Sequence, residues 1–167
     1  MKIYYREKSG GIEILRCFGI EGRVEIPGMI DGKLVISAVP YAFSSHMDEK
    51  EDLKNASLWE VSDGLEFGRE EHVLAGNDVE EIVFPYTLKE IGRYIFYGCG
   101  NLKKLEFSDS LMQIGCGAFT GCHALEKLTV HMRQGKKSGV KEMLGEMWQR
   151  IDVNFLYEYE LSLIHIS

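Results

Sequence analysis

Three cysteines and one histidine lie close enough in the sequence to suggest metal or nucleophile chemistry: Cys99, Cys116, Cys122 and His123. Thiolate sulfur and imidazole nitrogen are the usual ligands of zinc, and a cysteine thiolate is also a nucleophile. The spacing Cys-x5-Cys-His differs from that of common zinc modules. Cysteines that pack as small apolar side chains explain the same residues without a metal. The sequence therefore favours packing, and a metal-binding or enzymatic use of these four residues is kept as the alternative.

Other chemistry-bearing patterns are weaker. The stretch GCGAFTG at 115–121 resembles a phosphate-binding loop only in its first G-x-G, and its recurrence along the chain favours turn formation. No histidine belongs to a recognisable set of nucleophile, base and orienting group. Four cysteines are too few for a disulfide scaffold, and none forms a C-x-x-C pair. We predict no catalytic residue, no cofactor, no bound zinc or calcium, and reduced thiols.

The elements that position these residues form a repeat. The segments 88–107 and 111–130 carry the same residue types 23 positions apart, and Cys99 and Cys122 are one of the matching pairs. A fixed period in the range of about 20 to 50 residues is typical of solenoid proteins. Two looser copies precede these segments. In the nearer copy, Trp59, Val61, Leu65, Val73 and Val79 stand where Ile82, Phe84, Leu88, Phe96 and Leu102 stand. In the earlier copy, 24–27 mirrors 82–85 and 39–43 mirrors 114–119, so four coils are predicted.

Within each repeat, the spacing of the apolar residues changes along the chain as expected for one coil of a solenoid. Leu105 and Phe107 are two apart, as the inward face of a short strand requires. Gly92 and Gly115 then suit a tight reversal that a side chain would crowd. Phe96 and Phe119 are predicted to fill the core along the axis of the solenoid.

The flanks are predicted to be modified ends. Two strand-like runs around Ser9-Gly10-Gly11 predict a hairpin that caps the first coil. Helical spacing from Val140 to Ile151 and alternation from Val153 to Tyr159 predict a last coil that contains a helix and a strand. The predicted fold class is an α/β-type repeat solenoid with short parallel strands, about four coils of 23 residues, an N-terminal β-hairpin cap and one C-terminal helix. One domain spans 1–160, with the hairpin cap at 1–23, the repeats at 24–130, an acidic insertion at 46–55 and the modified last coil at 131–160.

The last seven residues, LSLIHIS at 161–167, resemble the translation of a common sequencing adapter. We therefore treat 161–167 as a non-native tail and expect the native chain to continue beyond about residue 160.

The repeat resembles the BspA-like class of bacterial leucine-rich repeats, whose units read roughly I-P-x-x-V-x-x-I-G-x-x-A-F-x-x-C-x-x-L. Phe84-Pro85, Leu88, Ile91-Gly92, Phe96, Cys99 and Leu102 match one unit. Leu111, Ile114-Gly115, Ala118-Phe119, Cys122 and Leu125 match the next. The sequence departs from this pattern at Ile95, which replaces alanine, and at Ser108, which replaces proline. The resemblance implies a right-handed leucine-rich repeat solenoid that recognises proteins or glycans, often on the cell surface.

Charge is unevenly distributed along the chain. The formal net charge is −7, but 48–81 contains twelve acidic and three basic residues and alone carries −9. This segment disfavours nucleic acid as a partner and would favour a basic partner. The chain contains no apolar run long enough to span a membrane, and charges at Arg6 and Glu7 interrupt any secretory core. The sequence as written predicts a cytoplasmic protein, and a cell-surface protein if the gene is incomplete.

Strand alternation predicts a candidate interaction face. Residues that alternate with the buried positions should point outward from neighbouring strands. They are Glu60, Glu81, Val83, Lys104, Glu106, Lys127 and Thr129. We therefore predict a non-enzymatic scaffold that recognises a protein or a glycan, because the apolar residues of the repeat are used in its core. The leading fragment of a larger surface adhesin is a second alternative.

Overall fold

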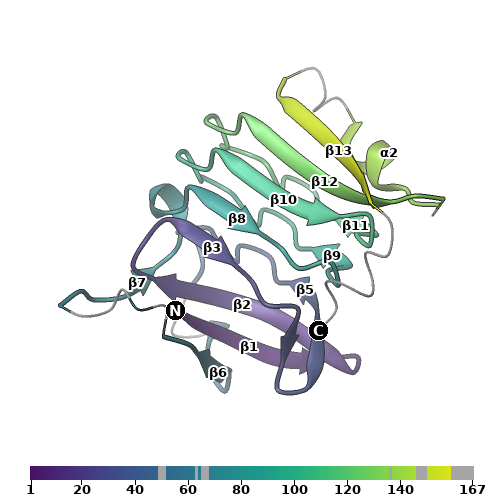
Figure 1. The fold of residues 1–167 in the computed structure, drawn as a ribbon. Coiled ribbons are helices and arrows are strands. Elements are labelled where there is room, and N and C mark those ends of the chain that lie inside the picture. The colour runs from purple at the N-terminus through teal and green to yellow at the C-terminus, as the bar shows by residue number, and fades with distance from the viewer. Residues whose placement is uncertain (49–51, 63, 65–67, 136, 146–149, 159–167) are drawn as a thin grey trace.

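The computed structural model describes residues 1–48, 52–62, 64, 68–135, 137–145 and 150–158. Two β-sheets run along the molecule, and short turns connect them (Figure 1). The five-stranded sheet has the order β13-β12-β10-β8-β3, and the eight-stranded sheet has the order β11-β9-β5-β2-β1-β6, with β4 paired to β5 and β7 paired to β2. The five-stranded sheet comprises β3 (Arg23–Glu25), β8 (Glu81–Val83), β10 (Lys104–Ser108), β12 (Lys127–Arg133) and β13 (Asp152–Glu158). The eight-stranded sheet comprises β1 (Lys2–Lys8), β2 (Gly11–Gly19), β4 (Met29–Ile30), β5 (Lys33–Ala38), β6 (Ser57–Glu60), β7 (His72–Val73), β9 (Glu90–Ile91) and β11 (Gln113–Ile114).

Each regular coil contributes one strand to each sheet. In the five-stranded sheet, Ile82 of β8, Leu105 of β10 and Leu128 of β12 lie in register in parallel strands. In the eight-stranded sheet, Ala38 of β5, Ile91 of β9 and Ile114 of β11 lie in register in the same way. These pairings confirm the predicted solenoid and its 23-residue coils.

A stack of phenylalanine rings fills the space between the sheets. The rings of Phe43 and Phe96 are 6.1 Å apart, and those of Phe96 and Phe119 are 5.7 Å apart. Phe43 and Phe96 are fully buried, whereas Phe119 is only half-buried against the core. Phe96 therefore has a ring on each side within this stack, and Phe119 lies at its margin with less burial than the prediction of a core position implies.

The glycines after Ile91 and Ile114 are required by the neighbouring coil. A Cβ atom on Gly115 would lie 2.1 Å from the backbone nitrogen of Arg93, and one on Gly92 would lie 2.3 Å from that of Pro40. Real Cβ contacts are never so short, so successive coils can approach this closely only at glycine.

The looser copy at 59–79 is not a coil, which corrects the predicted coil boundaries. Its strand β6 pairs antiparallel with β1 in the eight-stranded sheet. Val24 of β3 instead pairs directly with Ile82 of β8. Residues 45–74, here called the extension, leave the first coil after Phe43 and return before Gly76, whose nitrogen donates to the Phe43 oxygen at 2.9 Å. The extension is longer than the predicted insertion at 46–55 because it also contains β6 and β7.

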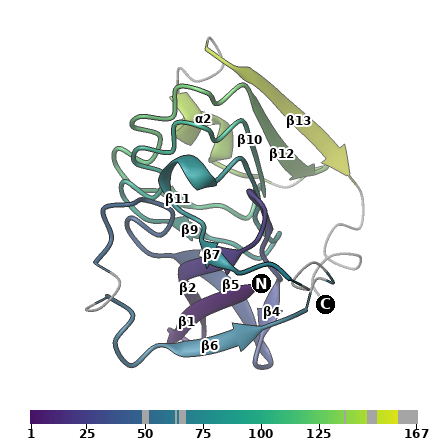
Figure 2. The ribbon, with the colours of Figure 1, turned by 90° about the vertical axis from the view of Figure 1, so that its left-hand side faces the viewer.

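The N-terminal hairpin is present where the sequence predicts it. Strands β1 and β2 pair antiparallel around Ser9 and Gly10, which both have positive φ angles. Strand β2 then pairs parallel with β5, so the hairpin continues the eight-stranded sheet beyond the first coil. In Figure 2, β1 and β6 lie at the opposite end of the molecule from β13.

The C-terminal coil contains a helix and a strand. Helix α2 spans Val140–Leu144, which is shorter than the predicted 140–151, and the predicted helix residues Met147 and Trp148 lie outside the described residues. Strand β13 pairs parallel with β12 and places Val153 opposite Leu128. Tyr159 and the tail 161–167 lie outside the described residues.

Candidate functional site

Six of the seven predicted face residues lie together on the five-stranded sheet. Glu81, Lys104 and Lys127 form one row across β8, β10 and β12, and Val83, Glu106 and Thr129 form a second row two residues further on. The side chains between the rows, Ile82, Leu105 and Leu128, are at most 2% exposed and belong to the core. The two rows line a shallow hollow of about 160 Å³, and Val83 is the one member of the six that does not line it. We call this surface the strand face.

Glu60 lies elsewhere in the molecule. It is the last residue of β6, where it pairs with Lys2 of β1, and the Lys2 Nζ to Glu60 Oε1 distance is 3.9 Å. Alternation along the strand is the same for a parallel and an antiparallel partner, so the pattern around Trp59 could not distinguish them. The strand face therefore excludes Glu60.

Four further residues extend the strand face at its ends. Arg23 and Asp152 continue the first row, and Glu25 and Asn154 continue the second. All four are exposed. The similarity of 24–27 to 82–85 is the sequence signal that could have placed Arg23 and Glu25 on the strand face. The alternation from Val153 onward is the signal that could have placed Asn154 there.

The two lysines of the strand face are its free cations. Glu81 is paired with Arg23, with 3.4 Å between Oε2 and Nε. Glu106 contacts the imidazole of His131. Lys104 and Lys127 are exposed and directly opposite each other, and neither makes an ion pair or a side-chain hydrogen bond with the described residues. Like charges on opposed strand positions repel, so this pair lowers the stability of the free sheet slightly.

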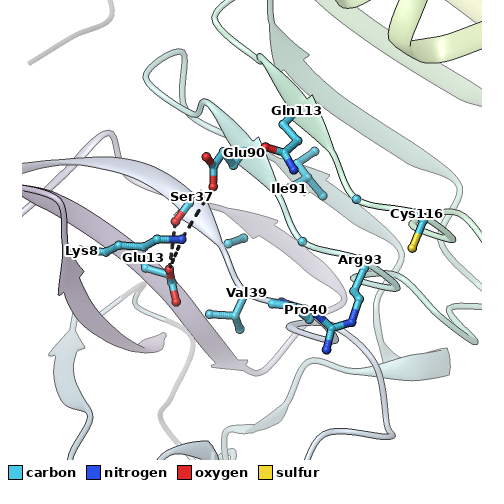
Figure 3. Close-up of a pocket in the computed structure, with 13 residues that line it drawn as sticks. Lys8, Glu13, Ser37, Val39, Pro40, Glu90, Ile91, Arg93, Gln113 and Cys116 are labelled. Atoms are coloured by element: carbon cyan, nitrogen blue, oxygen red, sulfur yellow. Dashed lines mark hydrogen bonds and ion pairs between the residues drawn. The ribbon is translucent and has the colours of Figure 1, made fainter.

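A second hollow, of about 390 Å³, lies on the eight-stranded sheet (Figure 3). The Lys8 amino group is 3.1 Å from a carboxylate oxygen of Glu13 and 3.7 Å from one of Glu90. The hydrogen bond and the charge of Glu13 raise the pKa of Lys8. Arg93 and Cys116 lie on the other side of this hollow, as Figure 3 shows. Lys8 is already paired within the chain, so it is a weaker candidate for ligand binding than the lysines of the strand face.

The structure separates the four residues of the metal alternative. Cys99 and Cys122 occupy equivalent positions in successive coils, whereas Cys116 and His123 are exposed. The Cys99 thiol donates to the Phe43 oxygen at 3.2 Å, and the Cys122 thiol donates to the Phe96 oxygen at 3.3 Å. All four cysteines are free, and within the described residues no three His, Cys, Asp or Glu side chains could hold a metal ion. The repeated cysteine is therefore a small buried donor that satisfies a carbonyl of the preceding coil.

Burial changes the acidity of these thiols. It raises the pKa of Cys17, Cys99 and Cys122 to about 12. A thiol is nucleophilic and binds metal as its thiolate, so burial makes these three cysteines poor nucleophiles and poor ligands at neutral pH.

The acidic segment 48–81 does not form one surface. Glu60 lies on β6, and Glu81 belongs to the strand face. Glu71 forms an ion pair with the N-terminal amine, with 3.3 Å between its Oε2 and the Met1 nitrogen. Its described carboxylates are therefore distributed over different parts of the molecule.

The fold and the strand face define a leucine-rich repeat solenoid. Residues 70–139 match the family model described as BspA type Leucine rich repeat region (6 copies). Residues 70–139 therefore carry leucine-rich repeats of the BspA type, which confirms the resemblance seen in the sequence of this segment. No curated protein matches the chain.

Two solved structures are similar to this chain. One is a leucine rich cell surface protein from Faecalibacterium prausnitzii A2-165, with 18% identity and a TM-score of 0.49 over 78% of this chain and 31% of that chain. The other is the Leucine Rich Repeat protein of T. pallidum, with 21% identity and a TM-score of 0.37 over 93% of this chain and 80% of that chain. This chain thus spans about a third of the first protein. Among the described residues, no helix has the length and apolar character that a membrane crossing needs.

Proposed function

We propose that this chain is a non-enzymatic scaffold that recognises a protein partner through the strand face, and that the partner places an acidic group against Lys104 and Lys127. The observation that carries this proposal is the pair of exposed lysines at opposed strand positions that line one hollow and have no ion-pair partner among the described residues. An incoming carboxylate would relieve their mutual repulsion and gain two ion pairs.

The surroundings of the lysine pair support this proposal. Glu81 is paired with Arg23, and Glu106 contacts the imidazole of His131, so both carboxylates already have partners other than the lysines. Thr129 adds a hydroxyl group to the lining of the same hollow. The ladder fixes the strand backbones, so the partner would need to order only the side chains of this surface.

The test uses a fluorescent hexaglutamate peptide as probe, with fluorescence anisotropy as the readout. The double variant Lys104→Glu/Lys127→Glu should bind it about tenfold more weakly, since exposed ion pairs contribute roughly 0.2 to 1 kcal/mol each. The double variant Lys54→Glu/Lys137→Glu changes the net charge equally at two other exposed lysines and should bind like the parent protein.

Equal losses in the two double variants would show that net charge alone governs binding and would overturn the proposal. Preference of the parent protein for hexalysine would overturn it as well, because that result assigns recognition to the acidic residues of 48–81.

A further inference from the structure

Two tyrosines occupy backbone positions that favour glycine. Tyr41 and Tyr94 have φ angles of 62° and 51°. They are equivalent residues of neighbouring coils, because the Tyr41 nitrogen donates to the Arg93 oxygen and the Tyr94 nitrogen donates to the Cys116 oxygen. The next coil has Gly117 at this position, with φ 65°. A bulky residue in the left-handed region is strained, and such strain is concentrated at functional sites.

The strained tyrosines belong to a cluster of four rings. Tyr41 and Tyr94 are stacked, with centroids 5.7 Å apart and planes at 16°. The ring plane of Tyr97 is at 78° to that of Tyr94, and the ring plane of His46 is at 77° to that of Tyr97, so both contacts are edge-to-face. The three tyrosines are half-buried, His46 is exposed, and together the four rings line a hollow of about 530 Å³. We call this cluster the aromatic platform.

The rest of the chain holds the aromatic platform in place. The buried guanidinium of Arg16 donates to the backbone oxygens of Tyr41, Ala42 and Ser44 at 3.2, 3.0 and 2.6 Å. Gly117 leaves room for the neighbouring ring, since a Cβ atom there would lie 2.2 Å from Cε1 of Tyr94. The platform is thus preorganised by the coils on which it stands.

The chemistry of the lining indicates the class of ligand. No carboxylate or ammonium group of the described residues lines the hollow, so a charged ligand would find neither of these groups as an ion-pair partner there. It offers the exposed parts of four rings together with phenol hydroxyls and an imidazole. A pyranose ring complements this surface, because it has an apolar face of C–H groups and a rim of hydroxyls. The volume of about 530 Å³ is in the range of small-ligand sites, roughly 300 to 1,000 Å³.

We propose that Tyr41, His46, Tyr94 and Tyr97 form a carbohydrate-binding site that takes a neutral hexopyranose unit of a polysaccharide. The site is separate from the strand face, so the chain would carry one surface for an acidic protein group and another for a sugar.

The experiment is electrophoresis of the full chain in native gels that contain a neutral polysaccharide: a β-glucan, an α-glucan or a galactomannan. We expect at least one of them to retard the protein, and titration calorimetry with the matching hexasaccharide then measures the affinity. Tyr94→Ala and Tyr97→Ala should each lower this affinity at least tenfold. Tyr157→Ala, at an exposed tyrosine outside the aromatic platform, and Lys104→Glu/Lys127→Glu on the strand face should leave it unchanged.

Tyr94→Gly separates binding from folding. Glycine suits the left-handed backbone, so this variant should lose binding while its thermal midpoint stays equal or rises. A large drop in the midpoint would assign Tyr94 a structural role and overturn the proposal. So would the absence of retardation by all three polysaccharides, unchanged binding in Tyr97→Ala, or tighter binding of tetramethylammonium than of the hexasaccharide.

Discussion

Arg16 shows how much one residue can determine in this fold. Its side chain is 1% exposed, and it donates to three backbone oxygens at the corner 41–44. Carbonyl groups at a buried corner need donors, and Arg16 of strand β2 supplies one to each of these three oxygens. A side chain rather than a backbone ladder therefore connects the hairpin to the first coil at this point.

Arg16→Met should destabilise the protein by roughly 1 to 3 kcal/mol, because the buried Ala42 oxygen loses its guanidinium donor and the Tyr41 and Ser44 oxygens each lose one of two donors. Urea unfolding followed by circular dichroism measures this loss. Arg6→Met removes the same side chain from an exposed position on β1 and should stay within about 0.5 kcal/mol of the parent protein. Equal stabilities of the two variants would mean that water or other donors replace the guanidinium.

The buried thiols make stability depend on alkaline pH. The pKa of Cys17, Cys99 and Cys122 rises from the ordinary 9.0 to about 12 in the folded protein. Below pH 9 both states keep the thiol proton, so stability does not depend on these groups. Between pH 9 and 12 only the unfolded chain releases the proton, so stability falls as pH rises, by at most about 1.4 kcal/mol per pH unit for each thiol.

Cys17→Ala should therefore flatten the pH dependence of the unfolding free energy between pH 9 and 10.5, measured by urea titration at several pH values. Cys116→Ala, at the exposed cysteine, is the control and should keep the slope of the parent protein. A Cys17→Ala slope identical to that of the parent protein would show that this thiol titrates normally in the folded state.

Several decisive residues give no readable signal in the sequence. Arg16 resembles any other charged residue in an alternating strand, because its partners are backbone oxygens that carry no residue identity. The backbone strain at Tyr41 and Tyr94 also cannot be predicted from these residues alone, because a residue type does not determine its φ angle. The repeat alignment already makes Tyr41, Tyr94 and Gly117 equivalent, and the glycine at the third position is the one signal that could have revealed the strain.

At the scale of the element, the coils are limited by how closely their backbones approach. Gly115→Ala should destabilise the protein by roughly 1 to 3 kcal/mol, because its Cβ atom would overlap the backbone of the preceding coil at Arg93. Gly139→Ala is the matched control: it has φ −90° and no atom within 4 Å of the added carbon, so its stability should stay the same or rise slightly. Thermal unfolding compares the two, and equal midpoints would mean that the coils can move apart at little cost.

Elements were predictable where coils follow one another without interruption. β8, β10 and β12 repeat every 23 residues, so periodicity alone identified their buried and exposed positions. The segment around Trp59 also alternates, but it forms β6, which pairs antiparallel with β1 and not with a strand of the repeat. An alternating pattern specifies which side chains face the core and leaves the partner strand and its direction open. For this reason, six of the predicted face residues lie together and Glu60 does not.

At the scale of the whole molecule, protection should be graded along the solenoid. Strand β10 has a neighbour on each side and buries Leu105 and Phe107, whereas β13 has β12 as its one neighbour among the described strands. Stability in repeat proteins is a sum over neighbouring coils, so the coil with one neighbour opens first. Hydrogen exchange followed by mass spectrometry should find the amides of β10 slowest and those of β13 fastest. Equal protection of β10 and β13 would mean that the molecule unfolds only as a single unit.

The extension leaves and re-enters the first coil at a single point. The hydrogen bond from the Gly76 nitrogen to the Phe43 oxygen closes the coil as if the thirty residues between Ser44 and Ala75 were absent. Loop-closure entropy grows only slowly with length, and the anchored ends do not change with what lies between them. This corner is therefore an insertion site. A peptide tag or a small domain with adjacent termini could replace part of the extension there while the path of the coils stays the same.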